Sequence, residues 1–220
     1  MPRAAQLVTE LVGTFLFLSV IALSQLSGSF APLALGMSLL ALVYMGGHIS
    51  GAHYNPAVSL GMVLRGKMAG RHMLAYWAAQ LTGGVLAFIA GYLLSGQTPG
   101  IHPGGKVSAL QALGVEVLFT AALVLVVLNV AATKRTHGNA FYGIAIGFVV
   151  AAAILVGGPI SGAAFNPSVG FGATLGAAMF ASGGWSDLWL YIVGPLIGSA
   201  IGAAINYAQS DRQEPADVTP

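Results

Sequence analysis

The chain has 220 residues, of which 56% are hydrophobic and only 6% are charged. Soluble domains carry about a quarter charged residues, so this composition excludes a soluble protein and indicates an integral membrane protein. The formal net charge is +2 and there is no cysteine. We therefore expect no disulfide and no thiolate metal site, and the absence of a basic patch with interleaved aromatic residues argues against nucleic acid as a partner.

Six stretches are long and apolar enough to cross a bilayer, which takes about 20 residues. In chain order, the predicted spans are 5–26, 31–48, 73–95, 109–132, 140–158 and 186–208. Two shorter apolar segments, 55–65 and 166–180, each begin at an Asn-Pro pair. Because they are too short to cross alone, we expect two half-helices entered from re-entrant loops. Such backbone is tolerated at membrane depth only where protein or a watery cavity surrounds it.

Both short segments begin with nearly the same phrase, SGAHYNPAVSLG at 50–61 and SGAAFNPSVGFG at 161–172. Asparagine caps the free N–H groups of a helix start, and proline fits the first turn. The two capping motifs are Asn55-Pro56-Ala57 and Asn166-Pro167-Ser168. Capped helix starts at matching places in two halves of an apolar chain are typical of a membrane protein with a central polar site.

The basic residues predict the orientation. Apart from Lys106, they lie before the first span, in alternate connections and after the last span: Arg3, Arg65, Lys67, Arg71, Lys134, Arg135 and Arg212. By the positive-inside rule both termini are cytoplasmic. Three spans per half then force two inverted repeats, 5–95 and 109–208, within one channel domain over residues 1–220. The polar tail 209–220 is expected to be disordered.

Glu10 and Glu116 are carboxylates inside predicted spans, and such residues are functional candidates by default. Since the two occupy matching places, we favour a supporting role, in which each accepts hydrogen bonds from the re-entrant loop of its own half. His48 and His53 invite a metal site, but no carboxylate or cysteine lies near them in sequence and the HExxH pattern is absent. We expect no metal or cofactor, and we interpret His48 as a further support of the loop.

The residues before each Asn-Pro should contribute backbone groups to a pore. They would leave carbonyl oxygens unpaired by helix, as a ladder of acceptors for a permeating molecule. The candidates are Gly51, Ala52, His53, Tyr54, Gly162 and Ala164. Two half-helices meeting tip to tip would point their positive N-terminal ends at the pore centre. Cations and protons are then disfavoured, while a neutral molecule can accept hydrogen bonds from the Asn55 and Asn166 amides.

Four segments together resemble the aquaporins, or major intrinsic proteins, over about residues 5–208. They are GGHISGAHYNPAVSLG at 46–61, ELVGTF at 10–15, YWAAQLTGG at 76–84 and the second SGAAFNP. The resemblance implies an all-α membrane protein with six transmembrane helices and two re-entrant half-helices around one pore per subunit. It also implies a homotetramer in the lipid bilayer of the cell membrane, with water and small neutral solutes as its partners.

The resemblance also implies a selectivity filter, carried over by position to Leu35, Ile154, Ala163 and Val169. Most relatives have arginine at the last of these places. Water-selective relatives usually have an aromatic residue at the first and histidine at the second, and glycerol-conducting relatives generally have aspartate where Gly170 follows Val169. Some bacterial aquaporins linked to arsenic resistance carry valine there. An apolar filter predicts passage of larger neutral solutes such as arsenous acid or glycerol. The alternative is a general water pore in which Val169 only tolerates lost selectivity.

A secondary transporter is the competing function, since inverted repeats with broken helices also describe transporters. It is disfavoured because no charged residue is left to couple an ion if Glu10 and Glu116 are structural. An adhesive or structural membrane protein ranks below it. An enzyme ranks lowest, because no nucleophile–base pair or metal set can be assembled from the sequence.

Overall fold

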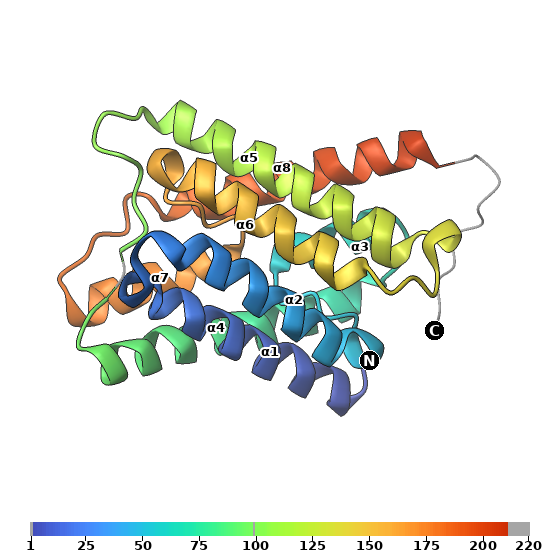
Figure 1. Ribbon diagram of the computed structural model, residues 1–220, viewed down its shortest axis with the longest axis horizontal. Coiled ribbons are helices and arrows are strands. Elements are labelled where there is room, and N and C mark those ends of the chain that lie inside the picture. The colour runs from blue at the N-terminus through green and yellow to red at the C-terminus, as the bar shows by residue number, and fades with distance from the viewer. Residues whose placement is uncertain (1, 99, 211–220) are drawn as a thin grey trace.

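The computed structural model describes residues 2–98 and 100–210, and every regular element there is a helix (Figure 1). Six of these helices are long and apolar enough to cross a membrane, which confirms the predicted spans. They are α1 (Ala4–Ala22), α2 (Ala31–Ser50), α4 (Gly70–Ser95), α5 (Ala109–Val127), α6 (Tyr142–Ser161) and α8 (Leu188–Gln209). Residues 211–220, most of the tail expected to be disordered, lie outside the described residues.

The two half-helices are α3 (Pro56–Leu64) and α7 (Pro167–Phe180), within two residues of their predicted ends. Three short irregular helices complete the described chain. They are the 3-10 helices η1 (Ser24–Phe30) and η3 (Lys134–Thr136), and the π-helix η2 (Leu128–Ala132), which continues α5. The first predicted span therefore ends earlier than expected, because the backbone tightens into η1 after Ala22.

The long helices run side by side along the long axis, and α3 and α7 fill the middle from opposite ends (Figure 1). The start of α1 and the end of α8 lie at the same end of this bundle. Arg65, the residue at the C-terminal end of α3, connects α3 to the end of α8. Its guanidinium donates to the Asn206 side chain at 2.6 Å and to the Ser210 hydroxyl at 2.9 Å.

Glycines allow equivalent helices to pack closely in the two halves. A Cβ on Gly83 of α4 would lie 2.5 Å from the carbonyl oxygen of Leu11 in α1. A Cβ on Gly198 of α8 would lie 2.5 Å from the carbonyl oxygen of Val117 in α5. Small residues permit this close approach of helices in a membrane. The matched contacts place α1 and α4 of the first half in the same relation as α5 and α8 of the second.

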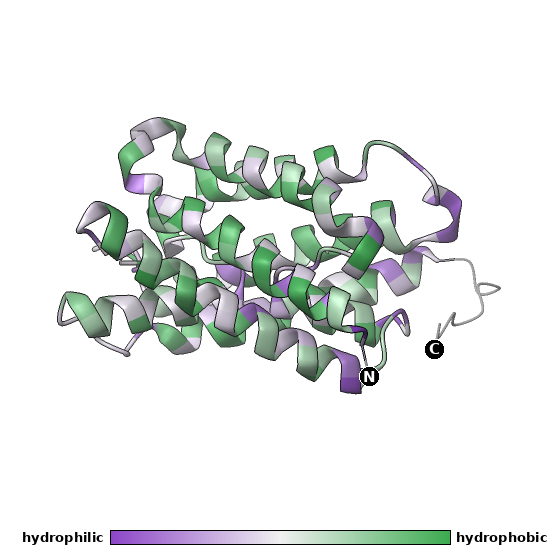
Figure 2. Ribbon diagram, turned by 90° about the horizontal axis from the view of Figure 1, so that it is seen from below, coloured by the Kyte–Doolittle hydropathy of each residue, from purple (hydrophilic) through white to green (hydrophobic). Residues whose placement is uncertain are grey.

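Polar residues are found at the ends of the bundle and inside it, while the outer faces of the helices are mainly apolar (Figure 2). The buried polar side chains include Glu10, Glu116, Asn55, Asn166 and Gln80, none more than 5% exposed. An apolar exterior suits lipid, and the cost of burying polar groups is avoided only where they find hydrogen-bond partners. The fold therefore concentrates its polar chemistry around the two re-entrant loops.

Candidate functional site

Each re-entrant loop begins with a glycine that ends the preceding helix in the left-handed region. Gly51 has φ 89° and Gly162 has φ 88°, and their N–H groups donate to the carbonyls of Gly47 and Gly158. Four further loop residues also have positive φ: Ala52, Tyr54, Ala163 and Phe165. For a residue other than glycine this conformation costs about 1–2 kcal/mol. The loops therefore need strong external supports.

Glu10, from α1, supports the first loop. Its carboxylate is fully buried and accepts four hydrogen bonds. The donors are the Ser50 hydroxyl at 2.6 Å, the backbone N–H groups of His53 and Tyr54 at 3.0 and 2.8 Å, and the Gln80 amide at 2.8 Å. Since the loop lacks helical partners for these N–H groups, one carboxylate satisfies the donors that would otherwise be orphaned.

Glu116, from α5, supports the second loop in the same way and is also fully buried. It accepts hydrogen bonds from the Ser161 hydroxyl at 2.8 Å and from the backbone N–H groups of Ala164 and Phe165 at 3.0 and 2.7 Å. The supporting role foreseen for both glutamates matches this geometry. The serine that precedes each loop was not singled out from the sequence, although the repeated Ser-Gly was a visible signal.

A tyrosine holds the hinge of each loop. The Tyr76 hydroxyl of α4 donates to the carbonyl of Ser50 at 2.8 Å, and the Tyr191 hydroxyl of α8 donates to that of Ser161 at 2.6 Å. These carbonyls lie at the C-terminal ends of α2 and α6, where the last helical oxygens lack partners within the helix. The two tyrosines therefore fix α4 and α8 in corresponding registers against the loops.

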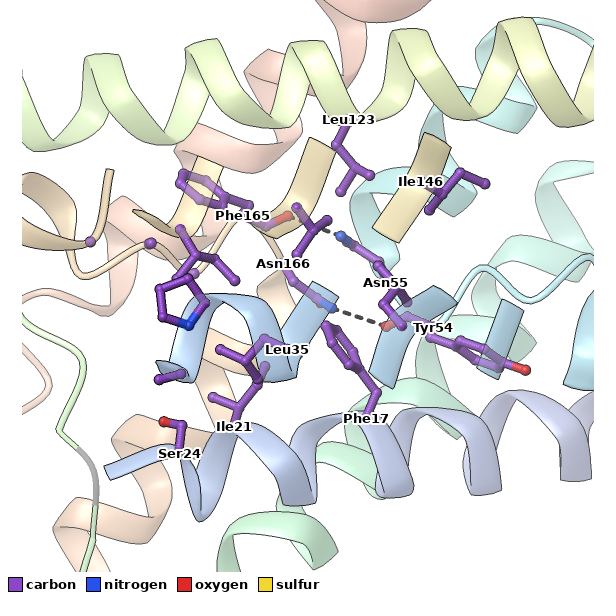
Figure 3. A pocket seen from close by; sticks show the side chains of 18 of the residues that line it. Phe17, Ile21, Ser24, Leu35, Tyr54, Asn55, Leu123, Ile146, Phe165 and Asn166 are labelled. Carbon is purple, nitrogen blue, oxygen red and sulfur yellow. Dashed lines mark hydrogen bonds between the residues drawn. The ribbon is translucent and has the colours of Figure 1, made fainter. Parts of the chain in front are cut away.

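The two asparagines cap the half-helices and join the loops to each other. The Oδ1 atoms of Asn55 and Asn166 accept from the N–H groups of Ala57 and Ser168 at 2.8 and 2.9 Å. Their Nδ2 atoms donate across the centre, Asn55 to the Phe165 carbonyl at 2.9 Å and Asn166 to the Tyr54 carbonyl at 3.0 Å (Figure 3). An amide has two N–H donors, so one on each side chain stays available.

A cavity of about 470 Å³ passes the two asparagines, which are both part of its wall. It extends from Ser24 and Ile101 at one end to Val43 and Val127 toward the other. All six residues predicted to supply backbone carbonyls line it: Gly51, Ala52, His53, Tyr54, Gly162 and Ala164. The rest of the wall is largely apolar, with Phe17, Leu123 and Ile146 projecting around the asparagine pair (Figure 3).

The comparison with known families decides the membership of the chain. The profile of the family described as "Major intrinsic protein" matches residues 2–207. The chain belongs to this family. It is 37% identical over 172 residues to "Aquaporin NIP1-1" of Zea mays, a match that covers 76% of this chain and 58% of the maize protein.

Longer matches and a solved structure agree with this membership. The chain is 37% identical over 218 residues to "Probable aquaporin TIP3-2" of Arabidopsis thaliana, covering 89% of this chain and 80% of that protein. The X-ray structure of the aquaglyceroporin from Plasmodium falciparum superposes with a TM-score of 0.74 at 24% identity, covering 91% of this chain and 94% of the other. That likeness shows the aquaporin fold.

Three of the four filter positions carried over to this major intrinsic protein lie in the cavity wall. Leu35, Ile154 and Ala163 line the cavity. Val169 is 1% exposed and packs in the hydrophobic core, outside that lining. Its short branched side chain at the third position of α7 stays among its apolar neighbours. Its role in selectivity remains a prediction.

One supporting residue was placed wrongly, and several supporting residues were missed. His48 is exposed on the last turn of α2, and within the described residues no hydrogen bond joins it to the loop. The support comes instead from Ser50, two residues later, which faces inward. Besides the loop serines and the two tyrosines described above, the missed residues are Gln80 of α4 and Ser59 of α3, both fully buried against the first loop. Only the packing of α4 on α3 brings them together, so no local sequence signal marks them.

Proposed function

We propose that this chain forms a passive transmembrane channel for water and small uncharged solutes. The observation that carries the proposal is the cavity between two half-helices whose N-termini are capped by Asn55 and Asn166 and joined across its centre. Each helix N-terminus carries the equivalent of about half a positive charge. Two such ends in one wall repel cations, while the second N–H of each asparagine can bind the oxygen of a neutral molecule.

The backbone of the two loops completes the path. Gly51, Ala52 and His53 on one side of the asparagines, and Gly162 and Ala163 on the other, line the cavity in conformations without helical hydrogen bonding. Their carbonyls can replace part of the water shell of a permeating molecule. The opposite wall is apolar, so a solute with hydroxyl groups on one side and few polar groups on the other fits this lining.

We further propose that the channel admits neutral solutes larger than water, such as glycerol or arsenous acid. Leu35, Ile154 and Ala163 bring no charge to the wall, and valine stands at position 169, where the resemblance to aquaporins leads us to expect an arginine. We also propose a cell-membrane protein with cytoplasmic termini, as the distribution of its basic residues predicts, and a homotetramer, as the resemblance to aquaporins implies. Size-exclusion chromatography with light scattering in detergent tests the assembly, and a monomeric mass would contradict it.

A secondary transporter is the alternative function. It would need a carboxylate that takes up and releases a coupling ion. Glu10 and Glu116, however, accept four and three hydrogen bonds, two of them in each case from loop N–H groups, so loading an ion there would release the loop. Solute uptake into proteoliposomes, measured with and without sodium and proton gradients, separates the two. We expect rates that are linear in concentration and indifferent to the gradients; saturable, gradient-driven accumulation would contradict a passive channel.

A further inference from the structure

The first half carries a chain of buried side chains that leads from Glu10 to the cavity wall. The Gln80 Nε2 atom donates to Glu10 Oε2 at 2.8 Å and to Ser59 Oγ at 3.1 Å. Ser59 Oγ lies 3.0 Å from Nδ1 of His53. Gln80 and Ser59 are fully buried, while His53 is 6% exposed and lines the cavity.

The direction of the hydrogen bonds in this chain follows from the donors available. Nε2 is the Gln80 atom that faces both Glu10 Oε2 and Ser59 Oγ, so the NH₂ group of the amide, which carries two protons, donates to the carboxylate. The same NH₂ group supplies the donor to Ser59 Oγ, which therefore acts as an acceptor toward Gln80. This orientation holds although Gln80 Oε1 is left without a partner among the described residues. The hydroxyl proton of Ser59 is then free to donate onward.

Ser59 has two acceptors within reach of that proton. One is His53 Nδ1 at 3.0 Å, and the other is the Asn55 carbonyl at 3.3 Å. The Asn55 carbonyl already accepts the backbone N–H of Ser59 at 3.1 Å in the first turn of α3. The shorter contact to an otherwise unpaired nitrogen is the better bond. Nδ1 of His53 is therefore an acceptor, and in a neutral imidazole the proton then sits on Nε2.

We propose that Gln80 and Ser59 fix His53 as the Nε2-protonated tautomer, so that its ring is a hydrogen-bond donor in the cavity wall for an oxygen of the permeating solute. The inference rests on the proposed channel function and adds a third donor to those of Asn55 and Asn166. The Tyr76 ring, 5.2 Å from the imidazole between centroids, packs against it and limits its rotation. Gln80 and Ser59 are positioning residues here, and His53 is the group that meets the solute.

The second half has no equivalent of this donor. Counting from the asparagines and from the hinge tyrosines, the places of His53, Ser59 and Gln80 are taken by Ala164, Gly170 and Pro195. None of these three carries a side-chain hydrogen-bonding group. The donor therefore lies on only one side of the asparagine pair. A solute that offers acceptor oxygens, such as a polyol or arsenous acid, is held there in preference to one that offers only donors.

Solid-state ¹⁵N NMR of the histidine-labelled protein in lipid bilayers tests the tautomer directly, with the His53 signals assigned by their loss in His53→Asn. We expect a protonated Nε2 and an unprotonated Nδ1. Ser59→Ala should move the proton or give a mixture of tautomers, and Ser59→Thr should restore the wild-type signals. Ser19→Ala, which removes a part-buried hydroxyl that donates to the Phe15 carbonyl, is the matched control. A proton on Nδ1 in the wild type, or signals unchanged in Ser59→Ala, would overturn the proposal.

Proteoliposome swelling then tests the role toward solute. In Ser59→Ala, but not in Ser59→Thr or Ser19→Ala, we expect the ratio of glycerol to water permeability to fall roughly fivefold, the size of one net hydrogen bond. If Ser59→Ala alters the His53 tautomer but leaves the ratio of glycerol to water permeability unchanged, the role of His53 as a donor to the solute is overturned. The proposed channel function is not affected by that result. Absence of any protein-dependent flux in the wild type would instead contradict the proposed function, while the NMR result would still decide the tautomer.

Discussion

In the first half of the chain the buried glutamate accepts four hydrogen bonds, and in the second half its counterpart accepts three. The three that both halves share come from a serine hydroxyl and two loop N–H groups. The fourth comes from Gln80. Tyr76 and Tyr191 set the register of α4 and α8, and four residues further along each helix lie Gln80 and Pro195. The shared hydrogen bonds hold the loops. The bond from Gln80, which only the first half has, begins the series of buried side chains that leads through Ser59 to His53 in the cavity wall.

A second difference has a steric cause. Ser59 and Gly170 are the fourth residues after Asn55 and Asn166. A Cβ on Gly170 would collide with the Cβ of Tyr191, whereas Ser59 fits among His53 and Gln80 without such a contact. The comparison of the two halves shows that the hydrogen bonds supporting the loops belong to the repeated fold. The side-chain chemistry facing the solute is set separately in each half, by the space that the neighbouring helix leaves.

Removing either glutamate should give the largest effect. Each loop donor that loses its partner costs about 1–3 kcal/mol, so Glu10→Ala and Glu116→Ala should both lower the yield of folded protein severely. Glu10→Ala should be the worse, because it orphans four donors and not three. Thermal unfolding in detergent, followed by tryptophan fluorescence, gives the ranking. Equal unfolding midpoints, or a more stable Glu10→Ala, would mean that the Gln80 bond contributes nothing to the loop.

Alanine at the two equivalent positions 59 and 170 should destabilise the protein to different extents. Gly170→Ala forces Tyr191 or α7 to move, and overpacking of this kind costs about 1–3 kcal/mol. Ser59→Ala loses one hydroxyl and should unfold within a few degrees of the wild type. Unfolding temperatures of the two variants in the same detergent check this. A Gly170→Ala protein as stable as Ser59→Ala would show that the contact with Tyr191 relaxes freely.

Arginine at position 169 should narrow the solute range. Its counterpart in the first half, Val58, lines the cavity, whereas Val169 does not. Only a longer side chain at 169 reaches the wall. Val169→Arg should reduce glycerol permeability roughly tenfold, which corresponds to about 1.4 kcal/mol in the barrier, with a smaller loss for water. Val169→Met controls for length without charge. Unchanged glycerol flux in the arginine variant would place position 169 away from the constriction.

The smallest effect is expected at a contact that joins the halves. His102, in the connection between them, lies 3.2 Å from Asp187 at the start of α8, and both side chains are at least 36% exposed. Exposed ion pairs contribute about 0–1 kcal/mol. His102→Ala should therefore change the unfolding midpoint by no more than a few degrees and leave the flux unaltered. Proteoliposome water permeability is the second readout, and a large loss of flux would assign this contact a role in keeping the cavity open.

Much of the fold followed from the sequence because hydropathy and helix capping are local signals. The Asn-Pro pairs marked the starts of α3 and α7 correctly. The fifth span was expected to end at 158, before Pro159, but α6 continues to Ser161 with the proline inside it. The packed bundle holds this last turn although Pro159 lacks an N–H, and Gly162 ends it by donating to the Gly158 carbonyl.

The supports of the loops were only half predictable. Glu10 and Glu116 stood out as carboxylates in apolar spans, and their repetition in the two halves indicated a shared role. Gln80 and Ser59 are single polar residues in apolar helices, and they become significant only because α4 packs against α3 beside His53. His48 was misread because its exposure depends on the rotation of α2, which composition alone does not define.

The most direct test of the central claim is stopped-flow light scattering on reconstituted proteoliposomes. The vesicles are challenged in turn with sucrose, which cannot enter, and with glycerol and arsenous acid. The account predicts fast, protein-dependent shrinkage in sucrose, and shrinkage followed by protein-dependent re-swelling in the two smaller solutes. Shrinkage without re-swelling would mean a water pore whose apolar wall still excludes solutes. Shrinkage no faster than in empty liposomes would contradict the channel itself.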